Sequence, residues 1–172
     1  MDAHEKAALL KQLENGKTAI LEALHGVSAE VSIRKPAPGK WSILECIEHV
    51  VVSEDYLFAQ ILAATPADAP VKNEKRESAI PTRGLDRTRT IESPEMAKPA
   101  GRFSTLNGAL RQFLALRERT IRFVETCDGD LRAQITTHPL FGSVNCYETL
   151  LMIAMHSLRH VKQIEECKPM LL

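Results

Sequence analysis

The chain has 172 residues, a length typical of one domain with a full hydrophobic core, so we expect residues 1–172 to form a single domain. Its 44% hydrophobic and 26% charged residues lie in the globular range. Lys plus Arg and Asp plus Glu each number 22, and zero net charge argues against nucleic acid as a partner, since nucleic-acid binding usually requires a basic excess. No apolar run approaches the ~20 residues of a membrane span, which argues against a membrane partner.

The first predicted helix covers residues 3–24. Its apolar stripe at spacings of three and four consists of Leu9, Leu13, Gly16, Ile20 and Leu24. Gly16 lies on this stripe, which indicates either the close approach of a neighbouring helix or a tolerated kink.

The second predicted helix begins after Ser42 and continues to about residue 64. Ser42 and Glu45 have the spacing of a capping box, and Trp41 with Cys46 has that of a hydrophobic staple. We expect Trp41 to anchor the start of this helix.

Residues 65–102 form a long crossover, interrupted by five prolines and rich in charge, in which we expect at most one short helix. Its arginines at positions 83, 87 and 89 suggest either a receptor for an anionic thiol cofactor or carboxylate, or solvated loop charges.

Two more helices complete the predicted fold. One covers residues 104–127 and ends at Asp128-Gly129. The other begins at Asn145, where Glu148 completes a second capping box, and ends before Pro169. The chain lacks an alternating pattern strong enough to predict a sheet. The sequence therefore predicts an all-α four-helix bundle with a long crossover between helices two and three.

The four cysteines indicate a reducing compartment. They are widely spaced, without a Cys-x-x-Cys motif, and the N-terminus carries acidic residues and a helix-like pattern instead of a signal peptide. We expect reduced thiols in a cytoplasmic protein.

The most informative feature is a pair of histidines, His156 and His160, in the apolar last helix. A spacing of four places both imidazoles on one helix face, with Cβ atoms about 5–6 Å apart, which suits one divalent metal ion. Such pairs also arise by chance, and the alternative is histidines bonded to backbone carbonyls. His4 and His25 are expected to be solvated.

His49 is the candidate third ligand. Antiparallel packing of helices two and four, with ends level, places His49 at the depth of the pair, whereas parallel packing separates them by roughly 9 Å along the axis. The crossover is long enough for helix three to run parallel to helix two, which gives an up-down-down-up bundle. Three neutral imidazoles leave a metal ion its full charge and an open position, as in catalytic sites; they suit Zn, and imidazole also suits Ni, Cu and Fe. Ser157 and Leu158 follow His156, so the Glu of the His-Glu-x-x-His motif of zincin proteases is absent.

Several motifs together resemble the DinB-like (damage-inducible protein B) superfamily, which includes the YfiT-like metal-dependent hydrolases. The residues that carry the resemblance are Lys40-Trp41-Ser42-Ile43, Glu48-His49, His138-Pro139-Leu140-Phe141-Gly142 and the stretch from His156 to Ile164. The resemblance implies an up-down-down-up bundle with Ni or Zn held by His49, His156 and His160. It also implies a small-molecule substrate and, because dimers are common in the family, a homodimer. Characterised relatives include thiol-dependent S-transferases, so a low-molecular-weight thiol is an implied cofactor.

The remaining candidates have two interpretations each. Gln163 and Arg159 flank His160, and either contact a ligand or substrate or lie on a solvated face. Tyr56 either shares the face of His49 or packs in the core. Glu48 and Glu148 either turn inward and serve as a base or, as we expect, are surface charges. His138 either binds metal or, as we expect, stabilises a turn before Pro139. No residue is assigned a catalytic role.

The sequence thus favours a divalent-metal-dependent enzyme, either a thiol-dependent S-transferase or a hydrolase. The alternatives are a non-enzymatic metal-binding or stress-related interaction module, and a metal-free structural bundle.

Overall fold

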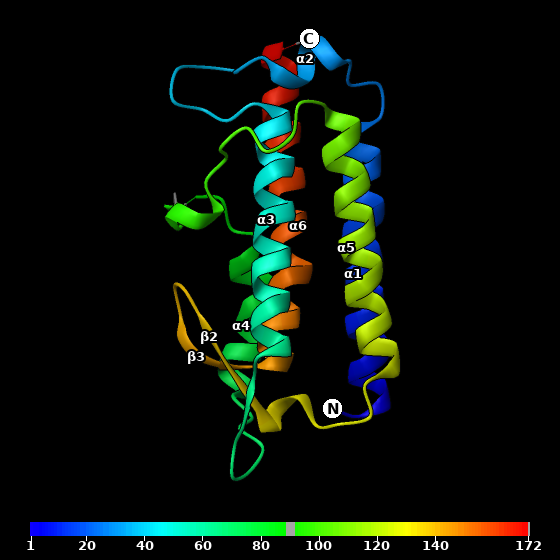
Figure 1. The fold of residues 1–172 in the computed structure, drawn as a ribbon, viewed down its shortest axis with the longest axis vertical. Helices are drawn as coiled ribbons and strands as arrows, with labels where there is room; N and C mark the ends of the chain where they lie inside the picture. The colour runs from blue at the N-terminus through cyan, green and yellow to red at the C-terminus, as the bar shows by residue number, and fades with distance from the viewer. Residues whose placement is uncertain (89–91, 172) are drawn as a thin grey trace.

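A computed structural model describes residues 1–88 and 92–171, and its core is a bundle of four long helices (Figure 1). These are α1 (Ala3–Leu24), α3 (Ile43–Leu62), α5 (Leu106–Thr126) and α6 (Cys146–Leu171). In Figure 1, α1 and α6 run upward while α3 and α5 run downward, which is an up-down-down-up order. Both α1 and α3 pack against α5 and α6. The predicted fold class is confirmed.

The connections contain more structure than the sequence predicted. They hold α2 (Ala29–Ile33), α4 (Glu74–Gly84), the 3-10 turns η1 (Glu95–Ala97) and η2 (Leu131–Ala133), and the strands β1 (Thr65–Pro66), β2 (Gln134–His138) and β3 (Gly142–Asn145). The strands form an antiparallel sheet of order β1-β2-β3, so the expectation of no sheet is wrong. Strands of two to five residues are too short to show an alternating pattern.

Helix ends follow their capping residues. The bounds of α1 are those predicted, and Ser42 with Glu45 forms the predicted capping box of α3. At α6, the Asn145 amide donates to Glu148 (3.0 Å) and the Glu148 amide donates to Asn145 Oδ1 (2.8 Å). The prediction that this helix ends before Pro169 is wrong, because the helix continues to Leu171, whose buried side chain holds the last turn against the core.

A buried polar layer divides the core into two hydrophobic clusters. Arg117 of α5, fully buried, donates from Nε (3.0 Å) and Nη2 (2.9 Å) to the Glu54 carboxylate of α3. Its Nη1 donates to the Leu13 carbonyl at 2.8 Å. A Cβ added at Gly16 would lie 2.8 Å from Arg117 Nη1 and closer still to Ser157 Oγ. Gly16 therefore marks a close approach of α1 to α6, which resolves the alternatives left by the sequence.

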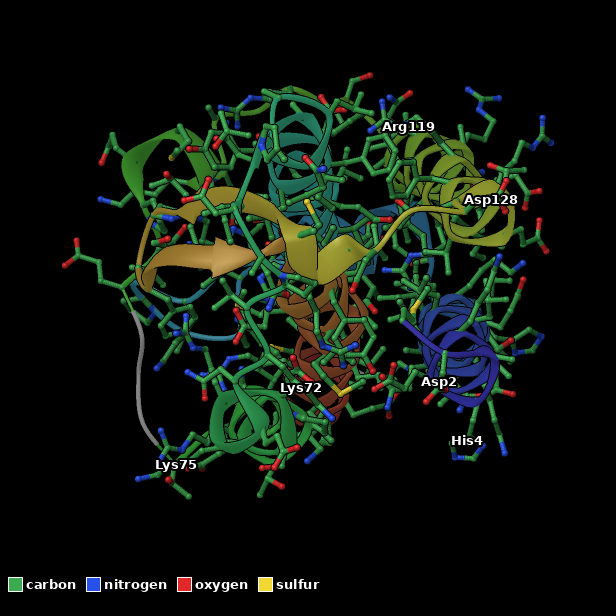
Figure 2. The ribbon with its side chains drawn as sticks, turned by 90° about the horizontal axis from the view of Figure 1, so that it is seen from below. Asp2, His4, Lys72, Lys75, Arg119 and Asp128 are labelled. Carbon is green, nitrogen blue, oxygen red and sulfur yellow. The ribbon has the colours of Figure 1, made fainter. Side chains whose placement is uncertain are left out.

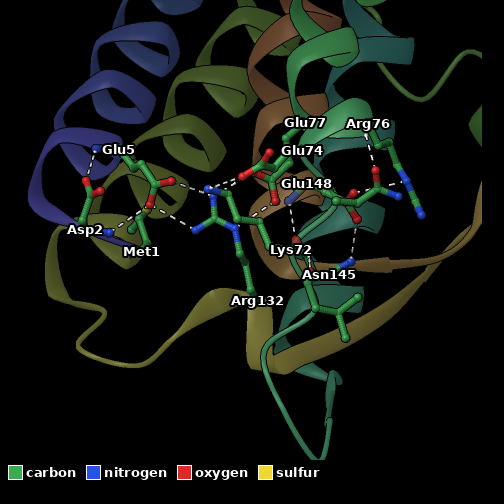
Figure 3. A network of polar contacts seen from close by, with 12 residues as sticks. Met1, Asp2, Glu5, Lys72, Glu74, Arg76, Glu77, Arg132, Asn145 and Glu148 are labelled. Atoms are coloured by element: carbon green, nitrogen blue, oxygen red, sulfur yellow. Dashed lines mark hydrogen bonds and ion pairs between the residues drawn. The ribbon is translucent and has the colours of Figure 1, made fainter.

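The lower end of the bundle is tied together by Arg132 (Figure 3). Its guanidinium donates to Glu5 of α1 at 2.8 and 3.0 Å and to Glu77 of α4 at 2.8 Å. The hydrogen bond from Arg132 lowers the pKa of the Glu5 carboxyl to about 2. Viewed from below, α4 lies beside α6 (Figure 2), so these ion pairs dock the start of the crossover onto the bundle.

The view from below also shows His4 pointing away from the bundle (Figure 2), and His25 is likewise exposed, as expected. All four cysteines, Cys46, Cys127, Cys146 and Cys167, are free thiols. Among the described residues, every helix is too short or too polar to cross a bilayer.

Candidate metal centre

The three predicted histidines converge where α3 and α6 pack together. His49 projects from α3, and His156 and His160 project from α6. Nε2 of His156 lies 3.0 Å from Nε2 of His49 and 3.1 Å from Nε2 of His160. Over residues 1–88 and 92–171, this is the one group of three or more His, Cys, Asp or Glu side chains whose ligating atoms lie close enough to share an ion.

Hydrogen bonds on the far sides of two rings fix their tautomers. His49 Nδ1 lies 2.7 Å from the Ala97 carbonyl, and His160 Nδ1 lies 2.9 Å from Gln163 Oε1. Carbonyl oxygens only accept, so both Nδ1 atoms carry the proton in neutral rings. Nε2 of each ring therefore presents a lone pair to the centre.

The nitrogen arrangement fits a cation better than it fits hydrogen bonding. With lone pairs on Nε2 of His49 and His160, the single proton that a neutral His156 can place on Nε2 serves only one of the two short contacts. A metal ion at the usual bond length of about 2.0–2.1 Å could instead accept all three lone pairs. The donor set of three imidazoles therefore fits a divalent metal ion.

Burial keeps the three rings neutral. His49 and His160 are buried and His156 is half-buried. Removal from water disfavours the charged imidazolium, so the pKa of His49 lies below its usual value, and those of His156 and His160 lie well below it. Neutral imidazole is the form that binds metal.

Trp41 forms one wall of the centre. Its ring centroid lies 4.8 Å from that of His49 and 6.4 Å from that of His160, nearly parallel to the latter. The residue expected to anchor α3 also covers two of the three histidines.

The flanking candidates lie at different distances from the centre. Gln163 does not join the cluster itself but bonds to His160 through its side-chain oxygen. Arg87 Nη1 donates to the same oxygen at 3.4 Å. Arg159 donates to the Asp86 carbonyl on the crossover. Tyr56 is partly buried and packs against the hydrophobic cluster that includes Leu57, Phe58 and Tyr147.

The crossover arginines have different surroundings. Arg87 pairs with the Glu166 carboxylate through two hydrogen bonds of 2.9 and 2.7 Å. Arg83 is exposed on α4, and Arg89 lies outside the described residues. Binding of an anionic ligand by this group stays a prediction.

Glu48 and Glu148 are not the surface charges that we expected. Both are buried, because each has a partner from the crossover. Glu48 receives hydrogen bonds from Ala100 and Arg102, and Glu148 caps α6 and pairs with Arg76 at 3.2 Å. The Ala97 carbonyl, which bonds to His49, was not predicted either, because every residue type has a backbone carbonyl.

His138 stabilises a turn, as predicted. Its Nδ1 accepts the Leu140 amide at 3.1 Å, and its ring stacks on Phe141 with centroids 4.7 Å apart. Burial lowers the pKa of His138 to about 4. An acceptor role for Nδ1 requires the neutral ring, consistent with that direction.

His138 should consequently make the fold acid-sensitive. A pKa lowered from 6.5 to about 4 contributes stability that is present above pH 6.5 and is lost as the pH falls towards 4. By pH 5 the loss is about 2 kcal/mol. In urea unfolding at pH 7 and pH 5, His138→Gln should lose less stability on acidification than the wild type by about this amount. An equal loss in both proteins would contradict the assignment.

The fold and the site can now be compared with known proteins. The family model of the DinB superfamily matches residues 12–164. Among solved structures, YfiT from Bacillus subtilis, described as "a probable metal-dependent hydrolase with an unusual four-helix bundle topology", has a TM-score of 0.61 and 17% identity, over 98% of this chain and 89% of its own. TT2238, described as a four-helix bundle protein, has a TM-score of 0.61 and 19% identity, over 94% of this chain and 98% of its own.

The comparison with curated proteins gives no match. At these low identities the two solved structures support the four-helix fold, while the family model covers most of the sequence, including all three histidines of the centre. The chain belongs to the DinB superfamily.

Proposed function

We propose that this protein binds one divalent metal ion, Zn or Ni, through Nε2 of His49, His156 and His160, and that it is a metal-dependent hydrolase or thiol-dependent S-transferase. The observation that carries the proposal is the convergence of three imidazole nitrogens, two of which are directed inward by hydrogen bonds from Nδ1. The description of YfiT as a probable metal-dependent hydrolase supports it by analogy of fold.

The residues of the site have separate tasks in this proposal. His49, His156 and His160 would hold the ion. Gln163 and the Ala97 carbonyl keep two ligands in the metal-binding tautomer, and Trp41 shields the rings of His49 and His160 from water. A divalent ion held by these three neutral ligands would supply Lewis-acid chemistry, which can activate water or a thiol near neutral pH.

Elemental analysis tests the metal site. Protein purified without a histidine tag should contain close to one Zn or Ni per chain, and His49→Ala should contain less than a tenth of that. His25→Ala removes an exposed histidine and should keep the wild-type content. Equal metal content in wild type and His49→Ala would contradict the proposed ligand set.

Activity assays of the metal-loaded protein distinguish the two chemistries. A panel of small esters and amides tests hydrolysis, and a panel of low-molecular-weight thiols with an electrophile tests S-transfer. Turnover that disappears in His49→Ala identifies the reaction class. Bound metal without turnover in either panel would favour a non-enzymatic metal-binding module. The small-molecule substrate, the homodimer and the cytoplasmic location stay predictions.

A further inference from the structure

The buried carboxylate of Glu48 lies one residue before the metal-ligand candidate His49 and is itself outside the histidine cluster. It accepts hydrogen bonds from the Ala100 amide (2.7 Å), the Arg102 amide (3.2 Å) and Arg102 Nη1 (2.9 Å). All three donors belong to the end of the crossover. A buried charge with this many partners from one segment fixes that segment against α3.

Arg102 links Glu48 to the backbone on both sides of Ala97, the last residue of η1. Besides its contact with Glu48, Nη1 donates to the Lys98 carbonyl at 2.9 Å, and Nη2 donates to the Met96 carbonyl at 3.3 Å. The two carbonyls are those of the residues on either side of Ala97. One guanidinium, held by one carboxylate, therefore fixes the backbone around Ala97.

Ala97 is the point at which this segment reaches the histidine centre. Its carbonyl accepts from His49 Nδ1 at 2.7 Å, and η1 packs against α3. If the carbonyl moved away, the proton could shift between the two ring nitrogens, and Nε2 would no longer be kept free. Residues 96–102 are called the strap. Glu48 and His49, which are adjacent on α3, thus bond to opposite ends of the strap.

We infer that Glu48 and Arg102 are positioning residues for the metal centre: they hold the strap so that the Ala97 carbonyl fixes His49 in the Nδ1–H tautomer. The inference rests on the proposed metal site. It assigns a role to the end of the crossover, residues 96–102.

The test combines Zn²⁺ affinity with the tautomer of His49. Affinity is measured by competition with a chromophoric chelator, and the tautomer by the ¹⁵N shifts of the imidazole in the metal-free protein. Glu48→Gln replaces an acceptor oxygen with an amide that cannot satisfy all three donors. It should weaken Zn²⁺ binding by about 10- to 100-fold, the usual effect of losing a partner of a metal ligand. The His49 signals should change from one tautomer to a mixture.

Glu148→Gln is the matched control. Glu148 is also buried and also pairs with an arginine of the crossover, but it lies eight residues before His156, about 12 Å along the helix. This variant should keep Zn²⁺ affinity within twofold and keep the single His49 tautomer. An equal weakening in both variants would show a general loss of stability and would overturn the inference.

Further outcomes are also decisive. Folded Glu48→Gln with wild-type affinity and an unchanged tautomer overturns the inference. Should Glu48→Gln not fold, Arg102→Met, which changes a partly exposed side chain, must show the same two effects. If the wild type binds neither Zn²⁺ nor Ni²⁺, the proposed function fails, and the His49 tautomer in metal-free Glu48→Gln still decides whether the strap orients the ring.

Discussion

Zn²⁺ or Ni²⁺ at about a thousand times its dissociation constant is expected to raise the free energy of unfolding by about 4 kcal/mol. The reason is linkage: the ion binds three nitrogens that only the folded chain brings together, since His49 and His156 are 107 residues apart in sequence. The stabilisation should grow with the logarithm of the free metal concentration. Thermal or urea unfolding in metal buffers measures it directly.

Single histidine variants give this prediction its specificity. His156→Ala removes the nitrogen that lies about 3 Å from each of the other two, and it should abolish the metal-dependent stabilisation. His4→Ala removes a solvated histidine and should leave it intact. A metal-dependent shift that survives in His156→Ala would mean that the ion binds elsewhere.

Glu54→Ala is expected to be strongly destabilising. It leaves the fully buried Arg117 guanidinium without its carboxylate, and breaking a buried ion pair from one side costs about 3–5 kcal/mol. The loss also removes one of the two acceptors of the Thr120 hydroxyl, the other being the Leu116 carbonyl. Urea unfolding of the metal-free protein measures the change.

The neighbouring residue provides the control for Glu54. Asp55 pairs with Arg119 at 2.9 Å, but both side chains are largely exposed, so Asp55→Ala should cost less than about 1 kcal/mol. The double variant Glu54→Leu with Arg117→Met removes both buried charges, and it should be more stable than Glu54→Ala. A double variant that is less stable than Glu54→Ala would contradict the view that the cost comes from an unpaired charge.

Local patterns were sufficient to predict the bundle. The apolar stripe of α1 and the capping residues Ser42 and Asn145 gave helix starts that the structure confirms. Helix length and antiparallel packing also brought His49 to the depth of His156 and His160. These features depend on residues near in sequence or on helix geometry, which a single sequence contains.

Several of the errors share a different cause, namely partners that are distant in sequence. Glu48 has the appearance of a surface charge on α3 until Arg102, 54 residues later, folds back over it. β1 contains a proline and exists because β2 pairs with it across the chain. The Ala97 carbonyl belongs to a residue type that predicts no function. The surroundings of the site were therefore harder to predict than its three histidines.

Anomalous X-ray diffraction from crystals of the metal-loaded protein, recorded at the edge of the bound metal, tests the central claim most directly. The account predicts one strong peak within about 2.0–2.1 Å of Nε2 of His49, His156 and His160. A metal peak at any other group of side chains, with the three imidazoles bonded only to each other, would contradict it.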